Sequence, residues 1–421
     1  MPATCKHITP IVAQHAEETA FLWSHRCVLV HMPHIGLSQL AKHDDRLAAH
    51  IDGLRVAGDR GWELCEVQLE VGEPGEMFAA MLIAAEEKNA AKMDKLFALA
   101  ESVPAMQTGL IAAFGWISAQ FLQGTIGGFL ASTSSFRRRV GIACCAMHRV
   151  DPHEALVAAI KDSDEVLRAQ ALRAIGELGR RDLMPVCEQH LRDEDVSCRF
   201  YAASSTALLG NHKIAIDALQ PFLPATGPFK NKAMQLALKI MPLTEAHQTL
   251  KTLAANNPLD KRTLIKGAGI AGDPFYVPWL IKEMEIPAFA RLAGESIGFI
   301  TGVDLAKLDL DRKPPENFES GPNDDPADAN VAMDEDENLP WPDPEKIQAW
   351  WNTNQHRFQS GIRHFMGEPV NIEHCKKALR DGFQRQRVAA ALYLSLLQPG
   401  MPLFPTSAPA WRQQRWLAKI G

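Results

Sequence analysis

Apolar and small residues recur at helical spacing in the stretch LRAQALRAIGELGRRDLMPV, residues 167–186. One stripe repeats at intervals of three or four residues and comprises Leu167, Ala171, Ile175 and Leu178. This spacing predicts a helix over residues 166–178 with one buried face. Gly179 suits the left-handed position that closes a helix, and Pro185 fits the first turn of a second helix. The pattern therefore predicts a helical hairpin.

The hairpin recurs with a period of about 31 residues. A shift of this length superposes pairs of like residues: Asp164 on Asp195, Arg168 on Arg199, Ala171 on Ala202 and Gly179 on Gly210. The register continues forward to residues 261–278 and backward to residues 106–116. A fixed period that contains two helices is typical of an α-solenoid, in which each unit is buried against its neighbours. We therefore predict an all-α fold, with an α-solenoid of helical hairpins over residues 73–308.

Both ends of the chain depart from this repeat. Residues 1–72 have apolar positions three or four apart but fall outside the register, so we expect a helical N-terminal cap. A partner-docking surface around Trp23 is the alternative for this region. The Pro- and Asp-rich residues 309–344 predict an extended linker or loop. Residues 345–421 are expected to form a C-terminal helical subdomain, because the Asp-Pro pair before them can cap a helix.

Charge is divided unevenly along the chain. Between residues 311 and 345, twelve acidic residues stand against two basic ones, a net charge of −10, whereas the whole chain carries −6. The rest of the chain therefore sums to about +4, and we expect the acidic segment to fold against it. The segment lacks the spaced carboxylates of an EF-hand loop. A partner contact is the alternative for the segment and its flank, through Asp334, Glu335, Asp336, Glu337, Trp341, Trp350 and Trp351.

No catalytic constellation emerges from the residue pattern. The chain has no nucleophile-elbow, phosphate-loop or dinucleotide motif, and the single pair His153 and Glu154 offers too few ligands for a di-iron centre. The eight cysteines lack paired zinc-site spacing, and the adjacent Cys144 and Cys145 are expected to be buried thiols. We therefore predict a non-enzymatic protein with no catalytic, cofactor-binding or metal-ligating residue and no cofactor.

Residues 102–136 carry no charge and are long enough to span a bilayer. They include Gln120, Gln123 and five glycines, and they keep the register of the repeats, so we predict buried helices rather than membrane insertion. The N-terminus has no signal-peptide pattern. With scattered cysteines and no basic surplus, the prediction is a cytoplasmic protein that does not bind nucleic acid.

The repeat pattern resembles HEAT repeats. In that family an Asp before the first helix and a nearby basic residue often form a ladder through the stack. The resemblance implies two such rungs, Asp164 with Arg168 and Asp195 with Arg199. An arginine surface that binds an anion is the alternative role for these residues.

Seven stretches extend the resemblance over nearly the whole chain: HAEETAFLW, HDDRLAAHIDGLRVAG, GWELCE, GELGRRDL, GDPFYVPWLI, ARLAGESIGFITGVDL and LPWPDPEKIQAWW. Together they resemble a proteobacterial family of HEAT-repeat proteins that are often encoded beside type VI secretion genes. The resemblance implies a cytoplasmic scaffold, an adaptor or chaperone-like factor whose protein partner is a secretion effector or its carrier. Two alternatives stay open: a HEAT-like enzyme or cofactor-handling protein similar to bilin lyases, and a self-assembling structural component.

Overall fold

A computed structural model describes residues 8–316, 318, 320–322 and 333–420, which divide into two compact units. Unit 1 combines the described residues up to Gly210 with Arg380–Ala391 and the residues from Gln398 onward. Unit 2 combines Asn211–Leu379 with Leu392–Leu397. The unit boundary thus falls inside residues 73–308, which the sequence pattern presents as one solenoid. Residues 345–421 do not form a subdomain of their own, because both units contain parts of them.

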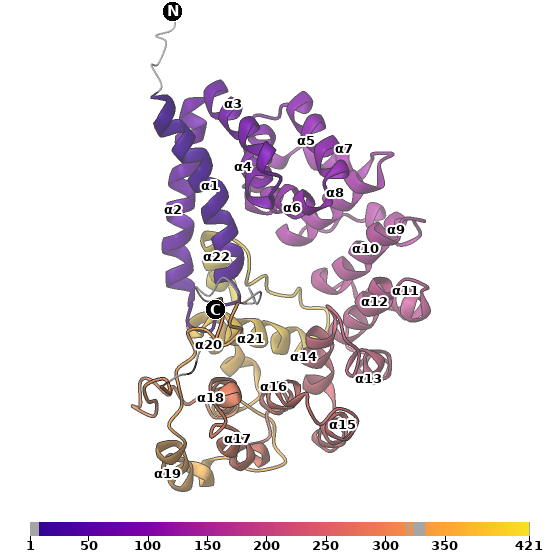
Figure 1. The fold of residues 1–421 in the computed structure, drawn as a ribbon. Helices are drawn as coiled ribbons and strands as arrows, with labels where there is room; N and C mark the ends of the chain where they lie inside the picture. Colours follow the sequence, from indigo (N-terminus) through magenta and orange to yellow (C-terminus); the bar gives the residue numbers. More distant parts are fainter. Residues whose placement is uncertain (1–7, 317, 319, 323–332, 421) are drawn as a thin grey trace, which may run out of the picture. The chain divides into compact units, whose positions relative to one another are not determined.

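Unit 1 consists of helices (Figure 1). Its α-helices are α1 (Thr9–Leu29), α2 (Leu37–Ala57), α3 (Asp59–Gln68), α4 (Pro74–Glu86), α5 (Ala90–Ser102), α6 (Gln107–Trp116), α7 (Thr125–Leu130), α8 (Ser135–His148), α9 (Glu154–Ile160), α10 (Glu165–Leu178), α11 (Met184–Gln189), α12 (Val196–Leu208), the first turns of α21 (Gln384–Leu397) and α22 (Ala410–Ile420). Short 3-10 helices are η1 (Leu69–Val71), η2 (Pro104–Met106), η3 (Ala119–Leu122), η4 (Arg181–Leu183) and η5 (His190–Arg192). Helices α4, α6, α8, α10 and α12 pack on one another in chain order, and α5, α7, α9 and α11 are their hairpin partners.

Unit 2 repeats this arrangement with fewer hairpins. It contains α13 (His212–Leu219), η6 (Gln220–Phe222), α14 (Lys230–Ile240), α15 (Leu243–Asn256), α16 (Lys261–Ala271), η7 (Pro274–Tyr276), α17 (Val277–Glu283), α18 (Pro287–Thr301), α19 (Pro344–Asn354), η8 (Gln355–Arg357), most of α20 (Ile372–Asp381) and the last turns of α21. Helices α14, α16 and α18 stack in chain order. The only strands among the described residues, β1 (His364–Phe365) and β2 (Glu368–Pro369), form an antiparallel pair with His364 opposite Pro369. The fold is an all-α solenoid of helical hairpins.

Local sequence signals set the bounds of α10. The Asp164 carboxylate accepts hydrogen bonds from the backbone N–H groups of Val166 and Leu167, which have no carbonyl partner at the start of a helix. Gly179 ends the helix at φ 71°, a left-handed conformation that glycine adopts without strain. Pro185 lies in the first turn of α11. The hairpin predicted from the apolar spacing is therefore confirmed.

Small residues let the stacked helices approach closely. In unit 1 a Cβ atom on Gly176 would lie 2.5 Å from the Ser205 hydroxyl oxygen of the next stacked helix, so only glycine fits. That hydroxyl accepts a hydrogen bond from the Gly176 N–H at 3.1 Å and donates to the Leu172 carbonyl at 2.6 Å. Unit 2 has the same contact, in which Ser296 on α18 donates to a carbonyl of α16 beside Gly269. Each contact joins neighbouring repeats directly.

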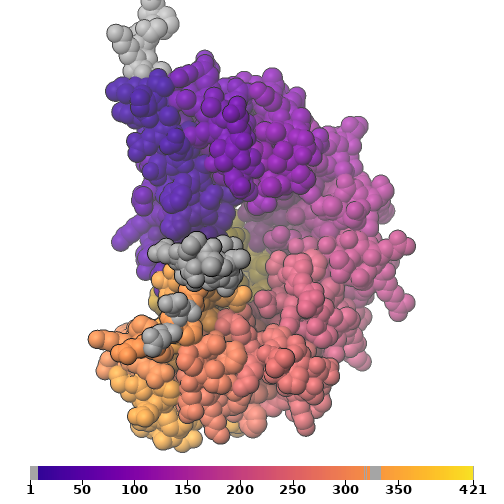
Figure 2. Space-filling model, viewed as in Figure 1, coloured from indigo at the N-terminus to yellow at the C-terminus, as the bar shows by residue number. Residues whose placement is uncertain are grey.

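The apolar core runs along the array as successive clusters. In unit 1 one cluster extends from Val12 on α1 to Cys144 on α8, and the next extends from Ile142 to Leu209. In Figure 2 the atoms of the indigo-to-magenta part of the chain form a closely packed surface. The N-terminal helices join this stack because α1 packs on α4. Burial therefore depends on nearest neighbours, as expected for a solenoid.

The uncharged residues 102–136 form short helices of the solenoid. They contain η2, α6, η3 and α7, and the longest of these, α6, has 10 residues. Leu110, Ala113 and Phe114 of α6 are fully buried. None of the helices in the described chain combines the length and the apolar character that crossing a bilayer requires.

Candidate functional site

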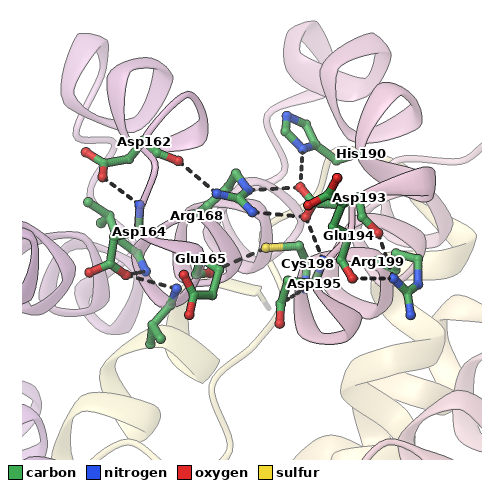
Figure 3. Close-up of polar contacts among 12 residues, drawn as sticks. Asp162, Asp164, Glu165, Arg168, His190, Asp193, Glu194, Asp195, Cys198 and Arg199 are labelled. Carbon is green, nitrogen blue, oxygen red and sulfur yellow. Dashed lines mark hydrogen bonds and ion pairs between the residues drawn. The ribbon is translucent and has the colours of Figure 1, made fainter.

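Arg168 connects two successive repeats in unit 1 (Figure 3). Its Nε and Nη2 atoms donate to the two carboxylate oxygens of Asp193, at 2.9 and 3.0 Å, and Nη1 donates to the Asp162 carbonyl at 2.8 Å. Hydrogen bonds from Arg168 hold the pKa of Asp193 well below its usual range, although burial opposes them. Planar two-point pairing of this kind is geometrically specific and stronger than a single contact. The pair fixes the loop before α12 to the start of α10.

The same contacts recur one repeat earlier. Arg138 on α8 donates to the Asp162 carboxylate at 2.6 Å and to the Ser132 carbonyl at 2.8 Å. Arg199 on α12 donates to the Asp193 carbonyl at 2.7 Å. Each arginine thus binds a carbonyl six residues before it, and those of α8 and α10 also bind an aspartate of the next repeat. A basic ladder therefore runs through α8, α10 and α12.

The ladder's carboxylates are not those that the resemblance implies. Asp164 and Asp195 bind the first turns of their own helices, where Asp195 accepts from the Cys198 N–H at 2.8 Å. Their oxygens are taken up as helix N-caps, so the acids two residues upstream, Asp162 and Asp193, pair with the arginines. The Arg168 and Asp193 side chains are only 16% and 7% exposed. The ladder therefore joins repeats and offers little surface to a ligand.

The described part of the acidic segment binds basic side chains of unit 2. Arg262 on α16 donates to both carboxylate oxygens of Asp336, at 2.7 and 2.8 Å. Lys266 binds Glu335 at 3.0 Å, and Arg291 on α18 binds Asp334 at 2.7 Å. The segment folds against a basic surface, as the charge distribution predicts. Three of its four acidic residues predicted to contact a partner therefore form ion pairs within the chain. The fourth, Glu337, is exposed. The acidic segment also includes residues 323–332, which lie outside the described residues.

Two of the four predicted partner-binding tryptophans lie in the core. Trp23 is 6% exposed and stacks on Phe78 with ring centroids 5.1 Å apart. Trp351 is buried and stacks on Phe358, while Trp350 is half-buried. Trp341, also half-buried, lies 4.7 Å from the Arg291 guanidinium. Trp23 and Trp351 are therefore core residues, a correction to the expected docking role. The apolar spacing of a helix does not distinguish an aromatic residue on a surface from one in the core.

Arginines close the ends of two stacked helices in unit 1. The last carbonyls of a helix have no donor within the helix. Arg412 on α22 donates to the carbonyls of Gly115 and Ile117 at the end of α6, at 2.8 and 3.2 Å. Arg149 donates to the Ala146 carbonyl of α8 and, through Nε, to the Leu403 carbonyl at 2.7 Å. Cationic groups at these ends also interact favourably with the helix dipoles.

These two arginines line a cavity of about 210 Å³ within unit 1. Arg26 of α1, Arg173 and Glu177 of α10, and residues 403–409 complete much of its wall. Although burial opposes it, Arg173 and Arg149 lower the pKa of Glu177, which stays ionised. No pattern in the sequence indicates this site, because its walls come from residues as far apart in the chain as Arg26 and Arg412, without common spacing.

A family model described as HEAT repeats matches residues 153–239, from the start of α9 into the last turn of α14. Residues 153–239 are similar in sequence to HEAT repeats. No curated protein and no solved structure matches the chain. The Arg168–Asp193 pair lies inside these HEAT repeats, whereas the cavity draws only Arg173 and Glu177 from them. The acidic turn, residues 334–337, binds side chains of α16 and α18 and lies beyond the HEAT match.

The cysteines of α8 are not placed for reaction as thiolates. Cys144 and Cys145 on α8 are buried, as predicted, and burial raises the pKa of Cys145 to about 11. The thiolate form that reacts with electrophiles is therefore scarce at neutral pH. Within the described ranges, no three His, Cys, Asp or Glu side chains are grouped to hold a metal ion.

Proposed function

We propose that this protein is a non-enzymatic scaffold that binds another protein. The observation that carries the proposal is the row of HEAT repeats at residues 153–239, of which α10 and α12 belong to the stack of α4 to α12. Repeats of this kind are stabilised by their neighbours and expose an extended surface, which suits binding to a partner protein.

Two apolar side chains on the HEAT repeats are exposed and support this role. Val166 and Val196 lie in the first turns of α10 and α12 and are 48% and 45% exposed. Both lie beside the rigid ladder, so a partner would meet preformed positions with little loss of side-chain entropy. Apolar side chains on such a fixed surface are suited to the centre of an interface.

A matched pair of double variants tests this surface. Val166→Glu with Val196→Glu places two charges on the HEAT repeats, while Val67→Glu with Val71→Glu places two charges on exposed residues of α3 and η1. Each full-length variant is used as bait in the native host, with cross-linking and mass spectrometry. We expect the first pair to lose a partner that the wild type and the second pair retain. A partner bound equally by all three proteins would reject this surface, and no partner for the wild type would reject the scaffold.

The resemblance to proteins encoded beside type VI secretion genes supports a narrower proposal. The partner is then a secretion effector or its carrier, and the scaffold acts in the cytoplasm as an adaptor. The test is co-purification of the full chain with each product of its neighbouring genes, expressed together. Binding to none of them, while another host protein is captured, would reject the secretion role and keep the scaffold.

A further inference from the structure

The arginine-lined cavity of unit 1 carries an excess of positive charge. Its lining contains four guanidinium groups, from Arg26, Arg149, Arg173 and Arg412, and one carboxylate, from Glu177. Asp44 adds a second carboxylate by accepting from Arg26 at 2.6 Å. Glu177 is shared by Arg149 and Arg173, at 3.4 and 2.7 Å, so the four guanidinium groups exceed the two carboxylates by two positive charges.

Arg412 shows this imbalance most clearly. It is 5% exposed, yet its hydrogen-bond acceptors among the described residues are neutral carbonyl oxygens at the end of α6. Burial lowers the pKa of Arg412 to about 10, and the nearby Arg415 and Arg26 add to the effect. A charged group removed from water without an opposite charge is costly to a fold. An anion in the cavity would offset that cost.

Donors remain available for such an anion. Nη2 of Arg149 and Nε of Arg412 make no hydrogen bond within the described part of the chain, although both residues line the cavity. Arg26, in contrast, is held by Asp44 and by the carbonyls of Ser407 and Ala408. The free donors therefore belong to the arginines that lack a carboxylate of their own.

Beside Thr406 and Ser407, the rest of the wall includes apolar side chains. Trp116, Met147 and Phe404 contribute to the lining of a space of about 210 Å³. A dry apolar cavity of about 150 Å³ accepts benzene, so this space is large enough for a small organic molecule. Guanidinium groups match the planar fork of a carboxylate, and the apolar side chains favour a hydrocarbon body over an inorganic ion.

We propose that this cavity binds a small organic carboxylate with an apolar body, of roughly ten non-hydrogen atoms. The ligand would contact the ends of α6, α8 and α10 together with residues 403–409, and would thereby stabilise the docking of the C-terminal residues on the repeats. The site is independent of the protein partner proposed above.

Calorimetric titration of the full chain with three probes tests the ligand class. Benzoate carries both a carboxylate and an apolar ring, benzamide keeps the shape without the charge, and inorganic phosphate has charge without an apolar body. We expect benzoate to bind at one site with a Kd of about 1 mM or tighter, and each of the other two to bind about tenfold more weakly. No benzoate binding in the millimolar range, or equal binding of benzamide or phosphate, would overturn the proposal.

Three variants locate the binding. Ser407→Trp fills the cavity from an exposed position of its wall, and Arg173→Gln removes a guanidinium whose side chain is 49% exposed. Arg180→Gln is the control, because it removes the same charge from an ion pair with Asp151 and Asp182 outside the cavity lining.

We expect Ser407→Trp to abolish benzoate binding, Arg173→Gln to weaken it about tenfold, and Arg180→Gln to leave it within about twofold. Equal losses in Arg173→Gln and Arg180→Gln would show a general charge effect and overturn the site. Circular dichroism checks each fold; if Ser407→Trp does not fold, the two arginine variants still decide.

Discussion

Lys239 on α14 is a buried lysine without a carboxylate partner in the described chain. It is 7% exposed; its Nζ donates to the Gln235 side-chain carbonyl at 2.9 Å and lies 4.7 Å from the centre of the Tyr393 ring. Burial, reinforced by the positive charge of Arg363, lowers the pKa of Lys239 from 10.5 to about 7. Arg363 cannot move away easily, because it donates to three carbonyls at the end of α14.

The lowered pKa makes folding depend on pH. In the unfolded chain Lys239 holds its proton up to about pH 10.5, whereas in the folded protein it releases the proton around pH 7. Above pH 7 the unfolded state therefore binds more protons, and the free energy of unfolding rises with pH. With these two pKa values, the rise between about pH 6 and pH 8.5 is about 2 kcal/mol. The stabilisation is lost as the pH falls through 7.

Lys239→Met removes the titrating group and keeps an unbranched side chain of similar length. Urea unfolding, followed by tryptophan fluorescence at several pH values, gives the free energy of unfolding for wild type and variant. We expect the variant to be more stable at pH 6 and the difference between the two proteins to shrink by about 2 kcal/mol by pH 8.5. Histidines that titrate in this range are common to both proteins, so their contributions cancel.

Lys251→Met is the matched control, since Lys251 is exposed on α15 in the same unit. Its curve should stay parallel to that of the wild type. If the Lys239→Met curve were also parallel to the wild-type curve over this range, the reasoning about the buried ammonium would be refuted.

Three further outcomes are expected. Asp193→Asn leaves a half-buried arginine without its carboxylate and should lower the free energy of unfolding in urea by about 2 kcal/mol at pH 7. Because the pKa of Asp193 is lowered, this loss should vanish as the pH falls well below 3.8; a loss that persists in acid would contradict the pairing. Gly176→Ala should lower the melting temperature, since its Cβ would lie 2.5 Å from a serine hydroxyl oxygen, whereas Gly127→Ala has open space and should not; equal effects would contradict the close packing. Asp336→Asn should speed hydrogen exchange of residues 333–343, and salt should do the same in the wild type; exchange indifferent to both would contradict the docking of the acidic turn.

The helical hairpins could be predicted from the sequence because they depend on interactions between residues that are close together in the chain. Helix spacing, the N-cap at Asp164 and the left-handed end at Gly179 involve residues within one or two turns of each other. Stacked repeats bury each face against the next copy, so the same pattern returns at a fixed period. The all-α solenoid follows from these signals, and so does the match of the acidic segment's charge to a basic surface.

Long-range contacts decided what the pattern left open. Arg168 binds an acid 25 residues away rather than the aspartate four residues before it, because Asp164 already serves the end of its own helix. Trp23 is in the core because Phe78 meets it from another helix.

The sequence by itself determined the helical hairpins and their order, because capping and apolar spacing act between near neighbours. Only the tertiary structure decided the division of the C-terminal residues between two units and the cavity that joins Arg26 to Arg412. Such contacts bring together single residues that are far apart in the chain. Because these residues do not recur at a fixed spacing, the sequence pattern does not predict the contacts. The ligand site therefore became visible only once the folded chain had brought its arginines together.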